Sequence, residues 1–350
     1  MATESKGTVL VTGGAGYIGS HTCQALAKAG WLPVAYDSLA GGHRWAVQWG
    51  PLELGDIADQ QRLCEVMERH QPKAVLHFAG RIAVGESVQD PALYYDSNVA
   101  ASLSLLQAMR TFGLDKIVFS STCAIYGNPD VIPITENTPP NPLSPYGATK
   151  YMIERVLADY GVAYGLKHAV LRYFNACGAS PDVSIGEAHE PETHLIPLIL
   201  QVAAGQRQNI AVFGQDYPTP DGTCIRDYIH VCDLARAHVL AVERLLAGAD
   251  SFTVNLGTGE GYSVSQVIEA TEKVTGKSIT RRLVDRRPGD PAILLSDVKK
   301  ARELLPDWLP QHSSLENILR DAWNWHLKQT TSAQGHHDDG NVPRKIGVNA

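Results

Sequence analysis

A tyrosine and a lysine in this chain are spaced so that they could act together on a hydroxyl group. Tyr146 and Lys150 stand four residues apart in Pro145-Tyr146-Gly147-Ala148-Thr149-Lys150. Residues at this spacing project from one face of a helix, so the phenol and the ammonium would be neighbours. A nearby ammonium lowers the pKa of a tyrosine from its reference value of about 10. The pair therefore predicts a proton-abstracting site, although ordinary solvated helix faces show the same spacing.

A third hydroxyl is expected to lie beside this pair. Thr122 follows Ser120-Ser121 at the end of an apolar stretch, residues 116–121, that is typical of a strand. The carboxyl ends of parallel strands form the ligand-binding edge of an α/β sheet. The Thr122 hydroxyl could there share a proton with Tyr146 and a substrate alcohol. Ser144 is expected to cap the helix that carries Tyr146, with Pro145 at its first position.

A glycine-rich segment near the start of the chain indicates a bound dinucleotide. Gly13, Gly16 and Gly19 directly follow the apolar run Val9-Leu10-Val11. A strand that leads through such a turn into a helix suits a pyrophosphate. Asp37 ends the next expected strand, where a carboxylate would bind an adenosine ribose and repel a 2′-phosphate. This pattern predicts NAD rather than NADP, with a simple turn or cap as the alternative role of Asp37.

Short apolar stretches alternate with helical ones through the first half of the chain. Strands are expected at residues 9–12, 32–36, 74–78, 116–121 and 170–174, and helices at 16–30, 59–70 and 98–111. This alternation predicts an α/β fold with a doubly wound, parallel, Rossmann-type sheet. The loops lengthen after residue 178, so we expect an NAD-binding domain at 1–177 and a smaller C-terminal substrate lobe at 178–330. Residues 331–350 are expected to form a disordered tail.

Composition excludes several classes of function. The chain has 350 residues, a net charge of -7 and 44% hydrophobic residues, which favours a globular protein and disfavours one that coats nucleic acid. No apolar run is long enough to span a membrane. Six cysteines without a C-x-x-C pair are expected to be reduced thiols, which favours the cytoplasm.

Two histidine-containing segments resemble metal motifs, but we expect neither to bind a metal. His189 and His194 are five residues apart with Pro191 between them, whereas the zincin pattern requires histidines four apart on a helix. A polar loop is the preferred interpretation. The second segment, His336-His337-Asp338-Asp339, falls in the expected tail.

Several motifs, taken in order along the chain, resemble the UDP-glucose 4-epimerases, which belong to the extended short-chain dehydrogenases. The matching motifs are Gly13-Gly14-x-Gly16-Tyr17-Ile18-Gly19-Ser20-His21-Thr22, His77-Phe78-Ala79-Gly80, Val84-Gly85-Glu86-Ser87, Tyr146-Gly147-x-x-Lys150, Leu171-Arg172-Tyr173-Phe174-Asn175 and Arg226-Asp227-Tyr228-Ile229-His230-Val231.

The resemblance implies a set of binding residues. By analogy, NAD would contact Tyr17, Ile18, Asp37, Asp56, Ile57, Phe78, Ala79, Gly80, Asn98, Ser120, Lys150 and Tyr173. A UDP-hexose would contact Asn175, His194, Leu195, Ala211, Val212, Phe213, Arg226, Arg287 and Asp290. Arginine forks at 226 and 287 suit a diphosphate, although surface ion pairing is their simpler role. The resemblance further implies that residues 226–246 return to the first domain and that the chain forms a homodimer.

Three positions depart from the family's best-known members. Thr122 stands where a serine is common, and it keeps the hydroxyl. Ile82 stands where some members have a lysine near the cofactor phosphates, so that contact is not expected here. Leu294 occupies the position of a residue that gates the sugar pocket, unless it is an ordinary core side chain.

The activity that the resemblance implies is interconversion of UDP-galactose and UDP-glucose. Tyr146 would take the 4-hydroxyl proton while hydride passes to NAD, and the 4-keto sugar would rotate before re-reduction. A UDP-pentose epimerase remains an alternative. Nucleotide-sugar 4,6-dehydratases and decarboxylases carry an acidic residue just after the strand-end hydroxyl, where this chain has Cys123 and Ala124. A non-catalytic NAD-binding regulator is the alternative from another class.

Overall fold

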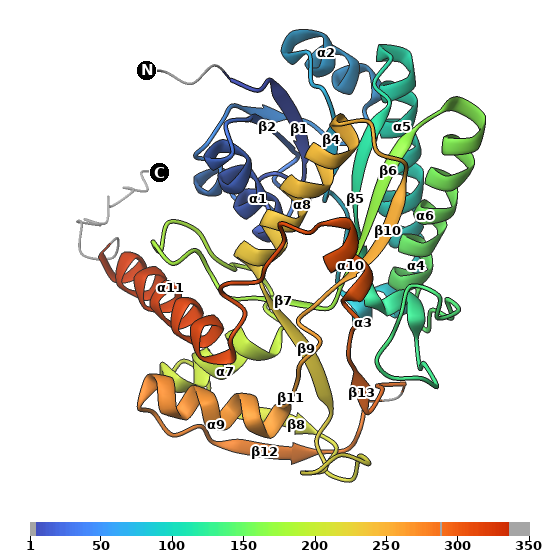
Figure 1. Ribbon diagram of the computed structural model, residues 1–350. Helices are drawn as coiled ribbons and strands as arrows, with labels where there is room; N and C mark the ends of the chain where they lie inside the picture. Colours follow the sequence, from blue (N-terminus) through green and yellow to red (C-terminus); the bar gives the residue numbers. More distant parts are fainter. Residues whose placement is uncertain (1–4, 288, 336–350) are drawn as a thin grey trace, which may run out of the picture.

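The computed structural model describes residues 5–287 and 289–335, and its largest element is a parallel sheet of seven strands (Figure 1). Their spatial order is β10-β6-β5-β4-β1-β2-β3. The strands are β1 (Thr8–Thr12), β2 (Leu32–Asp37), β3 (Leu52–Leu54), β4 (Val75–His77), β5 (Lys116–Thr122), β6 (Lys167–Tyr173) and β10 (Phe252–Leu256). The order runs outward in both directions from the centre, which confirms the predicted doubly wound fold.

Helices cover both faces of this sheet. On one face lie α1 (Tyr17–Lys28) and α8 (Val231–Leu246), and on the other lie α2 (Gln60–His70), α5 (Ala101–Phe112) and α6 (Pro145–Tyr164). Successive residues of β1 point to opposite layers. Val9 and Val11 pack with α1 and α8, whereas Leu10 packs with α2 and α5. Continuous apolar runs therefore form these strands, because both faces of the sheet are buried.

The smaller lobe contains two further sheets and a third hydrophobic cluster. Strand β9 (Ile225–His230) lies between β11 (Gly261–Ser263) and β13 (Ile293–Leu294), and it also pairs with β7 (Asn175–Cys177). The strands β8 (Ile210–Phe213) and β12 (Arg281–Val284) pair in parallel. Around them pack α7 (Leu195–Ala203), α9 (Val264–Thr275) and α11 (Leu315–Gly335). The cluster formed by these helices is separate from the two layers of the large sheet.

The chain returns to the large sheet after β9. Helix α8 packs along α1, and β10 then pairs with β6 at the edge of the sheet (Figure 1). Strand β10 lies in the segment that the sequence assigned to the smaller lobe. The chain then rejoins that lobe at β11. The two lobes are thus connected by several passages of the chain.

Other elements differ from the sequence pattern in detail. Residues 95–100 form a π-helix that precedes α5, so the helix expected from residue 98 is irregular at its start. The short helix α10 (Lys299–Leu304) packs near β10. Helix α11 continues through Gly335, and residues 336–350 of the expected tail lie outside the described residues, together with the His336-His337-Asp338-Asp339 segment. Among the helices described, none is long and apolar enough to cross a membrane.

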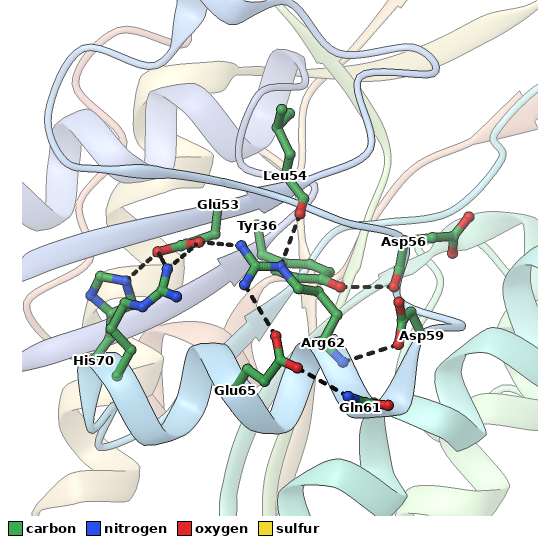
Figure 2. A network of polar contacts seen from close by, with 10 residues as sticks. Tyr36, Glu53, Leu54, Asp56, Asp59, Gln61, Arg62, Glu65 and His70 are labelled. Carbon is green, nitrogen blue, oxygen red and sulfur yellow. Dashed lines mark hydrogen bonds and ion pairs between the residues drawn. The ribbon is translucent and has the colours of Figure 1, made fainter.

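A network of charges joins α2 to the outermost strand, β3 (Figure 2). The Glu53 carboxylate accepts hydrogen bonds from Arg62 (2.5 Å), Arg69 (2.9 Å) and His70 (2.7 Å). Burial raises the pKa of Glu53, but the bonds from His70 and Arg69 outweigh it and hold that pKa below its usual value. Beside this network, the Tyr36 hydroxyl donates to the Asp56 carbonyl oxygen at 2.8 Å. These contacts fix the loop after β3, which contains two of the predicted cofactor residues.

Candidate active site

The helix α6 carries the tyrosine and the lysine, and it begins as the sequence predicted. The Ser144 hydroxyl accepts a hydrogen bond from the Gly147 N–H at 3.2 Å, and Pro145 occupies the first helical position. This cap fixes the first turn of the helix, in which Tyr146 lies. Lys150 follows one turn later on the same side of the helix.

Lys150 reaches from α6 to the carboxyl end of β5. Its side chain is 3% exposed, and Nζ donates a hydrogen bond to the Ser120 carbonyl oxygen at 3.0 Å. Burial lowers the pKa of Lys150 to about 8, and the negative charge of Glu154 opposes this shift. Lys150 therefore remains mostly protonated at neutral pH.

Tyr146 is hydrogen-bonded to the Thr122 side chain. Burial raises the pKa of Tyr146 to about 12, and the bond with Thr122 only partly offsets this effect. The prediction that Lys150 lowers this pKa below its usual value is wrong for the structure described, because the effect of burial dominates. Thr122 also accepts a hydrogen bond from the Ala124 N–H at 3.1 Å, which leaves its O–H free to act as a donor.

Two further predicted cofactor residues, Ser120 and Tyr173, meet next to Lys150. Their hydroxyl groups are hydrogen-bonded to each other. The Tyr173 ring lies 5.8 Å from that of His238 in α8, and the Phe78 ring lies 4.7 Å from the same histidine. Residues at the ends of β4, β5 and β6 thus form a continuous wall.

Asn98 and Gly80 approach Lys150 from the π-helix and from the loop after β4. Asn98 is buried; its Oδ1 accepts from the Arg81 N–H at 2.8 Å, and its Nδ2 donates to Thr149 Oγ1 at 3.2 Å. A Cβ on Gly80 would lie 2.9 Å from Asn98 Oδ1, at a backbone φ of +152°. Only glycine fits at this approach.

The glycine-rich turn brings the backbone close to the end of β4. Gly13 has φ +74°, and a Cβ there would lie 2.6 Å from the Ala79 nitrogen. A Cβ on Gly19 would lie 2.1 Å from the Gly13 carbonyl oxygen, so the helix can approach the turn only with glycine there. Within the described chain, no side chain caps the N-terminus of α1, whose first-turn N–H groups are therefore available to an anion.

Asp37 accepts hydrogen bonds from two backbone segments, which is the turn role considered for it. Its carboxylate accepts hydrogen bonds from the Ala15 N–H at 3.0 Å and from the Leu39 N–H at 2.8 Å. The bond from Leu39 is the turn role, and the bond from Ala15 places the carboxylate beside the glycine-rich segment. Two carboxylate oxygens offer about four acceptor positions, so a ribose hydroxyl can still be bound.

The cofactor residues expected by analogy lie along one edge of the large sheet. They follow β1 (Gly13, Gly16, Tyr17, Ile18, Gly19), end β2 (Asp37), follow β3 (Asp56, Ile57) or β4 (Phe78, Ala79, Gly80), or lie in β5 and β6 (Ser120, Tyr173). Tyr17 uses its hydroxyl to bind the Gly178 carbonyl oxygen at 2.6 Å, so only its backbone N–H remains for a cofactor. An uncapped helix end, a carboxylate and a buried lysine in this order match the parts of a dinucleotide. The donor set fits NAD.

The arginines expected to bind a diphosphate lie in the smaller lobe. Arg226, on β9, forms an ion pair with Asp290, and its side chain is 11% exposed. The Arg287 guanidinium lies 3.9 Å from the centre of the Phe213 ring, at the end of β8. Neither arrangement is a simple solvated ion pair, since one arginine is nearly buried and the other stacks on an aromatic ring.

Cys123, which follows β5, lies close to Arg226 and Leu294 of the smaller lobe. The charge of Arg226 acts on the Cys123 thiol, whose pKa burial raises to about 12. Leu294, on β13, pairs with Arg226 and packs with Cys123 against a cluster that includes Ile125.

The remaining predicted sugar-nucleotide residues also lie in the smaller lobe. They are Asn175, which donates a hydrogen bond to the Asp227 carbonyl oxygen at 2.9 Å, Ala211 and Val212 on β8, and His194 and Leu195 at the start of α7.

Sequence reasoning missed a buried ion pair between α6 and the large sheet. Glu154 and Arg172 approach to 2.5 Å with side chains 6% and 9% exposed, and the Ser121 hydroxyl also donates to Glu154 at 2.5 Å. The pair joins α6 to β5 and β6 directly under Lys150. In the sequence, Glu154 follows Lys150 by four residues, just as Lys150 follows Tyr146. This repeated spacing could have indicated that Glu154 lies on the same face of the helix.

A doubly wound sheet with a glycine-rich turn, a buried lysine and a tyrosine one helical turn before it defines a Rossmann-type enzyme that uses a nicotinamide cofactor. Comparison with known proteins gives the family. Residues 9–257 match the model of the NAD dependent epimerase/dehydratase family, and the chain belongs to it.

Relatives of the chain share most of its length. It is 53% identical to a UDP-glucose 4-epimerase of Rhizobium meliloti over 321 residues, which cover 92% of this chain and 97% of that protein. A crystal structure of UDP-glucose 4-epimerase from Brucella ovis in complex with NAD is 52% identical, with a TM-score of 0.89 over 91% of this chain and 98% of that one. The enzyme from Bifidobacterium longum, in complex with NAD+ and UDP, is 38% identical, with a TM-score of 0.86 over 92% and 99% of the two chains. These comparisons support the resemblance that the motifs indicated.

Proposed function

We propose that this protein interconverts UDP-galactose and UDP-glucose by inverting the configuration at C4 of the sugar. Eight relatives with 46% to 53% identity are UDP-glucose 4-epimerases. The observation that carries the proposal is the contact of Tyr146 with Thr122, next to the cofactor edge and to Lys150. A hydroxyl group of a sugar placed there would have a proton acceptor and a second hydroxyl within reach.

Tyr146 is the proposed acid–base group. As phenolate it takes the proton of the C4 hydroxyl, and as phenol it later returns that proton to the 4-keto oxygen. NAD, when bound, supplies the acceptor and then the donor of the C4 hydride. The 4-keto sugar turns over between the two proton transfers, and no net oxidation results.

The electrostatics of the site must favour the Tyr146 phenolate during the first transfer. The pKa of about 12 is too high for a base at neutral pH, so groups that stabilise the anion are needed. Thr122 acts in this direction through its hydrogen bond. Lys150, with a pKa of about 8, is mostly protonated at neutral pH and also favours the anion. A shift of Nζ from the Ser120 carbonyl toward the cofactor ribose and the phenolate would complete this stabilisation.

UDP is proposed to anchor the sugar while the hexose turns. Arg226 and Arg287 would bind the diphosphate through their guanidinium groups, with Asp290 and Phe213 holding them in place. His194 and Leu195 stand at the N-terminus of α7, where backbone N–H groups also favour an anion. Binding from the smaller lobe leaves the hexose free to move beside α6.

The alternatives are less well supported by the residues present. A dehydratase or decarboxylase needs an acid just after Thr122, and the Cys123 thiol, with its pKa raised to about 12, does not supply one. A regulator without activity would not need the Tyr146–Thr122 contact. A UDP-pentose substrate uses the same machinery and differs only in the wall of the sugar pocket.

Location and assembly are part of the same proposal. All six cysteines are free in the structure, which suits a reducing cytoplasm. A homodimer is the assembly that the family resemblance suggests.

The substitution Tyr146→Phe tests the proposed base. It should lower kcat for UDP-galactose by about 10²–10⁴-fold and leave copurified NAD unchanged. Tyr151→Phe is the matched control, because Tyr151 directly follows Lys150 on α6 but its side chain is exposed, and this variant should keep full activity. Near-normal turnover in Tyr146→Phe would refute the assignment of the base.

A further inference from the structure

Four side chains just before α7 form a compact group of metal-ligand type. Glu187, His189, Glu192 and His194 each offer one ligand atom, and these four atoms lie within 4.8 Å of one another. Glu187 Oε1 lies 3.1 Å from His189 Nδ1 and 2.8 Å from His194 Nδ1. Glu192 oxygens lie 3.7 Å from His189 Nδ1 and 3.1 Å from His194 Nδ1. Two nitrogen and two oxygen ligands thus surround a common point.

These separations agree with a tetrahedral zinc site. With metal–ligand bonds of about 2.0–2.1 Å, the ligand atoms of a tetrahedron stand about 3.3 Å apart. The four carboxylate–imidazole distances, 2.8 to 3.7 Å, lie on both sides of that value. Only small side-chain shifts would therefore be needed to admit an ion.

The backbone that carries the group is held from outside the loop. The Trp325 indole N–H, on α11, donates to the Glu187 carbonyl at 2.9 Å, and a His43 ring nitrogen contacts the Ala188 carbonyl at 2.7 Å. A Cβ on Gly186 would lie 2.4 Å from the Trp325 ring, so the loop packs tightly there. The side chains of Glu187 and Glu192 are only 7% and 9% exposed. Buried carboxylates at fixed positions need cationic partners.

The zincin pattern assumes that the histidines lie on a helix, whereas His189 and His194 lie in a loop. Their spacing in the sequence therefore does not decide whether they can bind a metal, and their ring centres are in fact 5.2 Å apart. The competing arrangement is an ion-pair network with two imidazolium groups. Burial lowers the pKa values of both histidines, but hydrogen bonds to Glu187 and Glu192 outweigh it and raise them to about 9 and about 10. A metal ion would take the place of the two protons.

We propose that Glu187, His189, Glu192 and His194 bind one divalent transition-metal ion of the zinc type. Imidazole and carboxylate ligands suit such ions, whereas Ca²⁺ and Mg²⁺ prefer six or more oxygen ligands. The ion would fix the loop to the start of α7 and set the position of His194. The proposed metal site shares His194 with the expected substrate contacts, but its ligand geometry does not depend on the proposed epimerase activity.

Zinc retention by the full chain tests the site. The purified protein with its native cofactor is equilibrated with Zn²⁺, freed of unbound metal by gel filtration, and assayed for zinc per chain. We expect about one ion in the wild type and about tenfold or greater loss of affinity in the double variant Glu187→Gln/His189→Ala. A variant with His336→Ala and His337→Ala controls for binding outside this group and should retain the ion.

Co²⁺ gives a second measurement on the unmodified protein. Loaded protein should show the intense visible absorption of four-coordinate Co²⁺, and added Zn²⁺ should abolish it. Absence of zinc from the wild type, equal retention by Glu187→Gln/His189→Ala, loss of the ion in the His336→Ala/His337→Ala control, or only the weak spectrum of octahedral Co²⁺ would each overturn the proposal.

Discussion

Lys150 shows that a side chain of this site can occupy a position that lowers the stability of the folded protein. Its ammonium is almost fully buried, and the carbonyl of Ser120 and the charge of Glu154 are the groups that compensate it. The position of Lys150 next to Tyr146 and Thr122 followed from helix spacing and from the strand-end rule, which are local properties of the sequence. The raised pKa of Tyr146 did not follow, because burial arises only when the sheet, α6 and the smaller lobe have packed together.

The burial of Lys150 leads to a prediction on stability. In the cofactor-free protein, Lys150→Met should raise the free energy of unfolding at pH 7 by about 2 kcal/mol, since about 3 kcal/mol of burial cost is removed and about 1 kcal/mol of hydrogen bonding is lost. The folded pKa of about 8 lies below the unfolded value of about 10.4, so the cost is complete below pH 8 and disappears as the pH rises to 10.4. The advantage of the variant should shrink over that window. Activity should nevertheless be lost.

Denaturant unfolding at several pH values measures this difference. Lys299→Met is the control, because that side chain is 85% exposed and should show no such pH dependence. A variant at position 150 that is less stable than the wild type at pH 7, or a difference that does not change with pH, would contradict the account.

The elements that show a clear local sequence pattern were predicted. Those that depend on pairing between distant parts of the chain, or that are very short, were not. The strands β1, β2, β4, β5 and β6 and the helices α1, α2 and α5 lie close to the expected ranges, and α6 begins where its cap was expected, because each has its own apolar pattern or end signals. The short strand β3 has too few residues to show a pattern, and β10 joins the sheet only through the return of the chain along α8. The π-helix at residues 95–100 carries one more residue per turn than a periodicity argument assumes. The Glu187–His194 group lies in an irregular loop, where no period exists to be read.

We predict that strand β13 limits which sugars fit, through the side chain of Leu294. It holds Leu294 beside Arg226 of β9 and against the Ile125 cluster that follows Thr122. An acetamido group at C2 would have to displace this side chain, at an overpacking cost of about 1–3 kcal/mol. We expect Leu294→Ser to raise kcat/KM for UDP-N-acetylglucosamine by about tenfold and to leave that for UDP-glucose within a few-fold.

Steady-state kinetics on both substrates measures this change, with Leu283→Ser on the exposed side of β12 as the control. Equal kcat/KM for acetylated and plain sugars in the unmodified protein would show that Leu294 does not limit the pocket.

In the molecule as a whole, the proposed cofactor site and the proposed substrate site belong to different lobes, but the two lobes are joined by several passages of the chain. The large sheet presents the cofactor edge, the smaller lobe presents the arginines, and the chain passes between them before β7, after β9 and after β10 (Figure 1). The start of β9 lies close to the segment that follows β5, so Arg226 acts electrostatically on Cys123. Such an arrangement suits a reaction in which the cofactor stays in place and the sugar turns.

The most direct test of the account is to incubate the purified protein with UDP-galactose, with no NAD added, and to follow the formation of UDP-glucose. We expect conversion to proceed to equilibrium over many turnovers, because the cofactor is regenerated in each cycle. Tyr146→Phe provides the background rate. Failure of NAD-containing wild-type protein to form UDP-glucose would contradict the proposed activity.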